Sequence, residues 1–283
     1  MKRIFTLSVI LCTALMGFAQ SDTTGKQNQN NMPDTIRVGG MIIIRRGGGG
    51  REIIRERHSD DSATYRRKYY KPSNVSTNWW ILDLGFSSFN DKTNYSSIAT
   101  QSFAPTSNDE SFKLRNWKSR NVNIWFFMQR LNIAAHVVNL KYGLGFELNN
   151  YFFDDESVHL NKIPSPARVS FDYTDLHKNK LAADYLTAPI MLNINFTPHR
   201  ERGFGISGGI SGGYLYSSRQ KIKEDGHIHK THDDFDLRKW KVSYVGEVLL
   251  GPVKLYGSYA TKSMWEKGLD QTPYTVGIRI SNW

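Results

Sequence analysis

The sequence has a single cysteine, and beyond its first twenty residues it has no long apolar run. Cys12 is the only cysteine among 283 residues, and it lies within the apolar run from Ile4 to Leu15. If that run is removed on export, the mature chain has no thiol, which excludes disulfides, thiolate catalysis and cysteine-rich metal sites. No later segment reaches the roughly 18 consecutive apolar residues of a transmembrane helix. A membrane-spanning mature chain would therefore have to be a β-barrel.

The first nineteen residues have the three parts of a secretory signal peptide. Lys2-Arg3 precede the apolar run, and Gly17-Phe18-Ala19 supply small residues at the positions that a signal peptidase needs. A leucine rather than a small residue precedes Cys12, so a lipoprotein anchor is not expected. We expect an exported protein that is cleaved after Ala19.

Positive charge dominates the region that follows. The formal net charge is +11, to which Lys2 and Arg3 contribute two. Nine bases and four acids lie between residues 45 and 71: Arg45, Arg46, Arg51, Arg55, Arg57, Arg66, Arg67, Lys68 and Lys71 against Glu52, Glu56, Asp60 and Asp61. We predict that residues 20–77 form a low-complexity, mostly flexible periplasmic extension, with at best a weak hairpin of Ile36–Arg46 against Arg51–Glu56 around a glycine tract. Its expected partners are anionic lipid, anionic cell-wall polymer or envelope proteins, and not nucleic acid; a solvated basic linker is the alternative.

Eight segments of alternating character follow Asn78. They are Trp79–Phe89, Asn121–Gln129, Leu140–Phe153, Tyr185–Phe196, Phe204–Tyr216, Trp240–Leu250, Val253–Tyr259 and Tyr274–Ile280. In each, one face is apolar and free of charge while the other holds Gly, Ser, Asn, Thr and the charged residues. In the second segment, for example, we assign Val122, Ile124, Phe126 and Met128 to the apolar face. Many of the segments have the nine to eleven residues of a tilted membrane strand.

This pattern predicts an all-β protein, an eight-stranded antiparallel transmembrane β-barrel with a flexible N-terminal extension. The expected division is a signal peptide at 1–19, the extension at 20–77 and the barrel at 78–283. Even-numbered positions such as Leu144, Leu192 and Ile210 should face lipid. The links between segments alternate long and short, and this rhythm is typical of outer-membrane barrels with both termini in the periplasm. We therefore expect the protein in the cell outer membrane.

Four pieces of the barrel region carry a resemblance to a known family. They are Trp80-Ile-Leu-Asp-Leu-Gly85, Tyr142-Gly-Leu-Gly-Phe-Glu-Leu-Asn-Asn-Tyr151, Tyr185-Leu-Thr-Ala-Pro-Ile190 and Gly205-Ile-Ser-Gly-Gly-Ile-Ser-Gly-Gly213. Together they resemble the PorT-like outer-membrane β-barrel family, also described as the outer-membrane protein β-barrel domain. The resemblance implies the architecture and, through one branch of the family, a role in protein secretion and gliding machinery. It brings no catalytic motif.

One histidine cluster invites a chemical interpretation. His227, His229 and His232, with Asp233 or Asp234, lie in the third long link and could ligate zinc or copper. A plain polar surface loop is the favoured alternative. An outer-membrane hydrolase that uses these histidines is a third, less favoured hypothesis, because no partner nucleophile is identifiable. We expect no enzymatic activity, no catalytic residue and no cofactor.

Seven charged residues are expected inside the barrel: Asp83, Lys141, Glu147, Lys241, Glu247, Lys254 and Arg279. Eight strands enclose a space that side chains can fill, so these residues should form a closed, charge-paired network rather than a conduction path. Three functions remain open. The first is a structural or binding barrel that acts through its surface loops and basic arm, the second is an accessory of an envelope secretion machinery, and the third is the hydrolase.

Overall fold

The computed structural model describes residues 34–38, 41–45, 51–55 and 72–281, apart from 165, 172–175, 201–202 and 225–226. The chain divides into two compact units, Met1–Arg66 and Arg67–Trp283. In the first unit, β1 (Asp34–Val38), β2 (Met41–Arg45) and β3 (Arg51–Arg55) form an antiparallel sheet in that order. The β2–β3 pairing lies where a weak hairpin was expected. The expected signal peptide, the glycine tract and the basic side chains lie outside the described residues.

The second unit is a closed barrel of eight antiparallel strands, as the sequence predicts. The strands are β4 (Val75–Asp91), β5 (Arg120–Ala134), β6 (Val138–Phe152), β9 (Leu176–Asn195), β10 (Phe204–Glu224), β12 (Trp240–Leu250), β13 (Val253–Ala260) and β14 (Gln271–Ile280). Each pairs with its neighbour in the chain, and the pairing of β14 with β4 closes the ring. Every strand edge within the ring is therefore hydrogen-bonded, which a structure in lipid requires.

Apolar side chains cover the outside of the barrel. Leu192 and Ile210 are 56% and 53% exposed, and Leu144 alternates with the buried Gly143 and Gly145. These positions face outward, as predicted. Aromatic rings mark the ends of this apolar belt: Tyr214 packs against Trp240 at one end, with ring centroids 4.9 Å apart, and Trp79 and Trp80 are exposed at the other. Within the described residues, no helix is both long enough and apolar enough to cross a membrane.

One predicted face is wrong near the start of the barrel. The sequence pattern places Met128 on the outer face, but its side chain is fully buried inside. The cause is a β-bulge in β5, where the register against β6 shifts by one residue between Trp125 and Phe127. An extra residue reverses the alternation beyond it. On the paired strand, Trp80 has a φ of 55°, and both it and Trp79 point outward.

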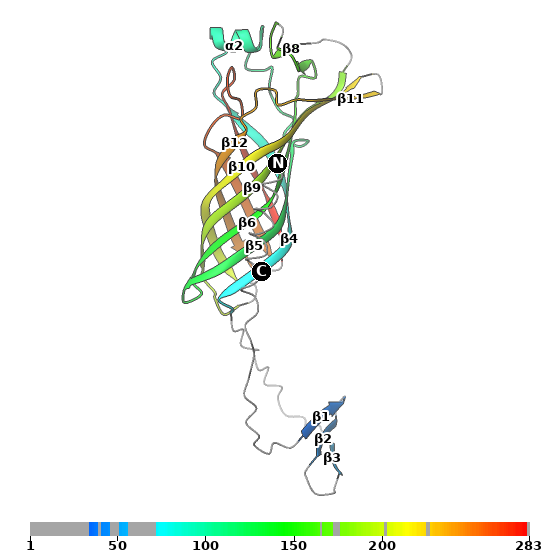
Figure 1. The fold of residues 1–283 in the computed structure, drawn as a ribbon, viewed down its shortest axis with the longest axis vertical. Helices are drawn as coiled ribbons and strands as arrows, with labels where there is room; N and C mark the ends of the chain where they lie inside the picture. The colour runs from blue at the N-terminus through cyan, green and yellow to red at the C-terminus, as the bar shows by residue number, and fades with distance from the viewer. Residues whose placement is uncertain are drawn as a thin grey trace, which may run out of the picture. The chain divides into compact units, whose positions relative to one another are not determined.

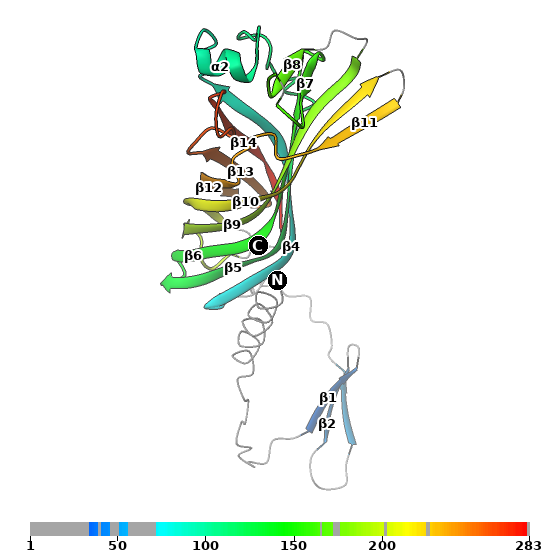
Figure 2. The same ribbon diagram turned by 45° about the horizontal axis from the view of Figure 1, so that its top comes forward.

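The two ends of the barrel differ (Figure 1). At the short-turn end, brief connections join β5 to β6, β9 to β10 and β12 to β13. At the opposite, long-link end lie α2 (Ile98–Phe103), β7 (Val158–Leu160), β8 (Val169–Phe171) and β11 (His227–His232), as Figure 2 also shows. The third long link, in which the sequence pattern places the histidine cluster, is shorter than predicted, because β10 continues to Glu224 and pairs with β11. Strands β9 and β10 therefore extend together well beyond the apolar belt.

The long links pack into a hydrophobic cap at the mouth of the barrel, a feature that the sequence pattern did not reveal. Phe103 of α2 meets Trp265 edge-on at 5.7 Å, and Phe112 meets Phe153 at 6.2 Å. Polar contacts fasten the cap to the strands. Gln220 of β10 donates to the Val158 carbonyl at 2.8 Å and accepts from the Leu160 amide at 2.8 Å. The buried apolar members of the cap are Phe103, Ala104, Phe112, Tyr151, Phe153, Val158, Leu160, Val169, Leu181, Ala183, Tyr185, Leu215, Phe235, Leu237, Met264, Trp265 and Leu269.

Candidate functional site: the charged lumen and its mouth

Asp83 anchors one end of a buried ionic network in the lumen. It projects inward from β4 opposite Arg279 of β14, its direct cross-strand partner. Arg279 donates to both carboxylate oxygens, at 2.6 and 2.7 Å. Asn123 and the Trp125 indole also donate to this carboxylate, at 3.2 and 2.7 Å. These four donors offset the cost of burying a carboxylate that has no exposed surface.

Glu247 of β12 extends the network across the lumen. It forms ion pairs with both Lys141 of β6 and Arg279. The Ser207 hydroxyl donates to the same carboxylate at 3.1 Å. Arg279 thus lies between two carboxylates, and its guanidinium also stacks over the Trp125 ring at 5.4 Å. Four strands far apart in sequence are tied together through this single arginine and its partners.

Glu147 and Lys241 make a second ion pair nearer the mouth. Their atoms are 2.5 Å apart, and the side chains are only 8% and 9% exposed. Asn149 and Thr187 also donate to Glu147, at 3.1 and 3.3 Å. The Lys241 ammonium lies 4.3 Å from the centre of the Tyr185 ring, a cation–π contact at the base of the cap.

Six of the seven charges expected in the lumen therefore lie in these two clusters. The seventh, Lys254, is buried on the inner face but points toward the end of the chain, where it donates to the Ser281 carbonyl at 3.0 Å. Lys254 is the second residue of β13, which begins with Val253 at the short-turn end of the barrel. It therefore lies apart from the two charge clusters.

Aromatic side chains fill much of the remaining lumen, in addition to the charged residues that the sequence predicts there. Trp125 is two and four residues from the inward-facing Asn123 and Asn121, and Tyr256 is two residues from Lys254. Because alternate residues of a strand lie on the same face, the alternation predicts both rings inside the barrel. Tyr256 donates to Asn121. Gly145 on the neighbouring strand makes room for the indole, because a Cβ there would lie 2.8 Å from Cε3 of Trp125. Ile81, Trp125, Met128 and Met191 form a small apolar cluster toward the short-turn end.

Little space is left at the centre of the lumen. A cavity of about 30 Å³ lies among Trp125, Glu147, Glu247 and Arg279. That volume has room for about one or two water molecules, and the polar side chains around the cavity can hydrogen-bond to them. Together with the cap above and the apolar cluster below, this packing leaves the lumen occupied by protein.

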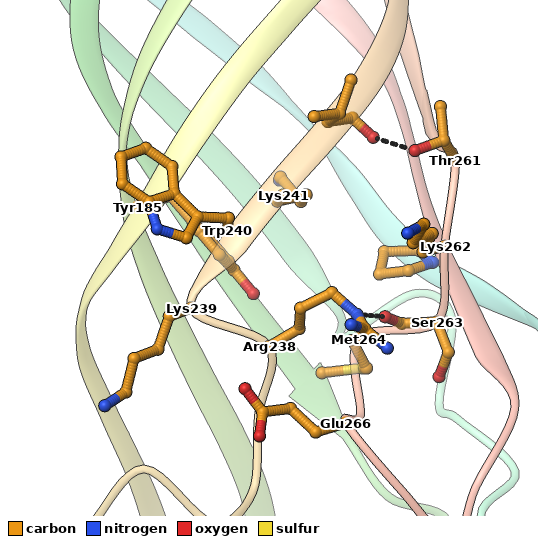
Figure 3. Close-up of a pocket in the computed structure, with 12 residues that line it drawn as sticks. Tyr185, Arg238, Lys239, Trp240, Lys241, Thr261, Lys262, Ser263, Met264 and Glu266 are labelled. Carbon is orange, nitrogen blue, oxygen red and sulfur yellow. Dashed lines mark hydrogen bonds between the residues drawn. The ribbon is translucent and has the colours of Figure 1, made fainter.

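A larger hollow of about 320 Å³ opens at the mouth, between the start of β12 and the β13–β14 link (Figure 3). Basic side chains line it, and Glu266 is the one acid in the lining: the bases are Arg238, Lys239, Lys241 and Lys262. Its serine is committed to structure, since Ser263 donates to the Leu269 carbonyl at 2.9 Å and accepts from the Gln271 amide at 3.1 Å. No histidine is among the residues that line the hollow.

The three candidate metal-ligating histidines lie on β11 rather than in a loop. His227 and His229 share one face of the strand, but His232 is three residues further on and points to the other face. Among the described residues, no group of three or more His, Cys, Asp or Glu side chains could hold a metal ion. Asp233 instead pairs with Arg168 at 3.0 Å. Strand pairing with β10 thus separates residues that a flexible loop could have brought together.

Comparison with known proteins identifies the family. No curated protein matches the chain. Among solved structures it is similar to Ail, the attachment invasion locus protein of Yersinia pestis, with 11% identity over 74% of this chain and 100% of that one and a TM-score of 0.33. The family model described as outer membrane protein beta-barrel domain matches residues 79–259, more than half of the chain. The chain therefore belongs to the outer membrane protein β-barrel domain family, and is a β-barrel of the outer membrane.

Proposed function

We propose that this protein is a non-enzymatic outer-membrane barrel, exported by its N-terminal signal peptide, that acts as a structural or binding protein. Its binding surfaces are the capped long-link end, which faces the cell exterior, and the basic arm at residues 20–77, which faces the periplasm. The observation that carries the proposal is the filled lumen. Ion pairs across the barrel, aromatic rings and a hydrophobic cap occupy the path that a solute would take.

Electrical recording in planar bilayers tests the closed lumen. The full-length protein should give no steady conductance above that of the protein-free bilayer. The informative variant combines Lys141→Ala, Trp125→Ala and Trp265→Ala, which together remove a network member, a lumen ring and a cap ring. Channel-like steps in this variant but not in the wild type support a filled barrel. Steady conductance of the wild-type protein would instead establish a pore and overturn the proposal.

The PorT-like resemblance supports a second candidate, an accessory role in an envelope protein-secretion machinery. The motifs Trp80–Gly85 and Tyr142–Tyr151 carry that resemblance, while the matched family model is the broader one. A pull-down from detergent-solubilised envelopes discriminates the candidates, using the intact protein and a form lacking residues 20–77. Stoichiometric envelope proteins that are lost with the arm support the accessory role. Recovery of lipid alone with both forms argues against it.

A further inference from the structure

A positively charged ladder covers one side of the sheet that projects beyond the barrel. We call this projection the wing; it comprises residues 176–184 of β9, 217–224 of β10 and the whole of β11. Lys180 lies directly opposite Lys221, which in turn lies opposite Lys230. Lys178 lies opposite Lys223. Directly opposed residues of an antiparallel pair share a face, and this basic ladder consists of Lys178, Lys180, Arg219, Lys221, Lys223 and Lys230.

The two faces of the wing differ sharply. The alternate residues Asn179, Leu181, Gln220 and Ile222 are buried, and they point toward the cap. The basic ladder is on the opposite face, which is the outward one. The pairing of β9 with β6 runs without a register shift, so Lys178 and Lys180 share the outward face with Ile190 and Leu192. The ladder is thus a continuation of the lipid-facing surface of the barrel.

The ladder lies just beyond the aromatic end of the apolar belt. On β10, Tyr216 is 47% exposed at that end, and Arg219 and Lys221 follow three and five residues later. At about 3.3 Å per residue and a strand tilt of about 45°, these residues lie about 7 to 12 Å above the tyrosine. The headgroup region adds about 5 to 8 Å to each side of the hydrocarbon core, so Arg219 lies at headgroup height and Lys221 lies at the outer edge of that layer.

Few acidic side chains neutralise the positive charge of the basic ladder. Like charges directly opposite each other on a sheet are destabilising. Asp184 pairs with Arg219 at 2.6 Å, and within the described residues it is the only acid in an ion pair with this face. Lys178 and Lys180 each lie 5.4 Å from the Phe152 ring centre, and Lys180 also donates to Asn150. Neither contact supplies negative charge to Lys221, Lys223 or Lys230.

From these observations we infer that the basic ladder binds phosphate groups on lipid headgroups of the outer leaflet that surrounds the barrel. Multivalent anions at that depth would relieve the repulsion between opposed lysines, and the lipid would approach from the side that the ladder faces. The inference rests on the outer-membrane placement in the proposed function and does not depend on whether the lumen conducts.

Lipid-dependent unfolding of the full-length protein in neutral detergent micelles tests this inference. The folded state is followed by heat-modifiable gel migration, and the probe is diphosphorylated lipid A, with dephosphorylated lipid A and soluble pyrophosphate as separate arms. We expect the phosphorylated lipid alone to raise the unfolding midpoint. The variant Lys180→Gln/Lys221→Gln/Lys223→Gln should need about 100-fold more lipid for half the effect, because each base near an anionic surface changes the affinity about five-fold.

A matched variant controls for the loss of positive charge elsewhere at the long-link end. Lys92→Gln/Lys162→Gln/Lys267→Gln should respond to lipid as the wild type does. An equal response from the ladder variant, or from the dephosphorylated lipid, overturns the inference. A shift reproduced by pyrophosphate alone also overturns it, because the ligand would then be soluble.

A salt titration on the wild-type protein needs no variant and covers the case in which the ladder variant does not fold. The lipid-induced shift should shrink steeply between 0.05 and 1 M salt as screening increases (the Debye length falls to about 3 Å at 1 M). A shift that persists undiminished at high salt is evidence against headgroup binding through the ladder. Such a failure would leave the bilayer conductance result, and with it the closed-barrel proposal, unaffected.

Discussion

At the scale of single residues, the lumen depends on groups whose partners lie on other strands. Removing one partner leaves a buried charge without compensation, which costs more than the pair contributes. Asp83→Ala should therefore lower the free energy of unfolding by about 3–5 kcal/mol, because Arg279 loses its bidentate acceptor and must share the Glu247 carboxylate with Lys141, which leaves one buried positive charge uncompensated. Urea unfolding of the protein in lipid vesicles measures this change.

The exposed pair of Lys113 and Glu110 supplies the control, since its side chains are 56% and 65% exposed. Lys113→Ala should change the free energy of unfolding by no more than about 1 kcal/mol. If Asp83→Ala proved equally mild, the network would contribute nothing to stability, and the lumen would have to be more hydrated than its packing indicates.

Glycines give a second prediction, because those facing the lumen and those facing lipid have different surroundings. A Cβ on Gly145 would lie 2.7 Å from the Trp125 Cα, whereas one on Gly212 meets nothing within 4 Å. Gly145→Ala should cost about 1–3 kcal/mol through overpacking, and Gly212→Ala should be neutral or slightly stabilising. The same unfolding assay checks both, and equal effects would show that the faces are wrongly assigned.

At the scale of the strand, the alternating pattern predicts the barrel well, and its failures have identifiable causes. Period-two alternation correctly assigns Leu144, Leu192 and Ile210 to the outside. It fails at Met128, because a β-bulge adds one residue to β5 and reverses the faces beyond it. The alternation of residue types does not show where such a bulge occurs. The alternation also gives no warning that β10 continues past the membrane to pair with β11, since the polar residues there resemble a loop.

Depth along a strand gives a third prediction. Leu192 faces outward in the middle of the part of β9 that carries the apolar belt, and Thr197 lies in the turn after that strand. Leu192→Lys should cost about 2–4 kcal/mol, and Thr197→Lys about 1 kcal/mol or less. Unfolding in vesicles of defined lipid measures both. A cost at residue 192 no greater than at residue 197 is incompatible with a lipid-facing position.

The cap gives a fourth prediction, because hydrogen bonds hold it to β10 through one amide side chain. Gln220→Leu removes the donor to Val158 and the acceptor for Leu160. Hydrogen exchange at the Leu160 amide should accelerate by about 10-fold or more, since an unmade buried hydrogen bond costs about 1–3 kcal/mol. Exchange within β12 and β13 should not change. Unaltered exchange at Leu160 would mean that other contacts within the cap protect this amide without the Gln220 side chain.

At the scale of the whole molecule, the chain consists of two compact units, divided between Arg66 and Arg67. The sequence pattern instead places a boundary between residues 77 and 78, where low complexity and mixed charge give way to the first alternating segment, and that boundary stays a prediction. The pattern does not predict the filled mouth, since the apolar residues of the long links come from distant parts of the chain and only the closed barrel brings them together.

The division gives a fifth prediction. A form lacking residues 20–66 should insert into lipid vesicles and show the wild-type unfolding midpoint, because among the residues that the structure describes the barrel strands pair with one another and with β11 alone. Heat-modifiable migration and urea unfolding check both properties. A barrel that fails to fold without this segment would require the first unit to assist assembly.

The long backbone pairing between β9 and β10 also has a mechanical consequence. The two strands pair from Asn195 and Gly205 within the belt to Leu176 and Glu224 in the wing. A force applied at the tip of the wing would load their hydrogen bonds along the strand direction, in shear, so that many bonds share the load instead of opening one after another. Any object that adheres to the wing would thus be tethered to the membrane through the longest strand pairing of the barrel.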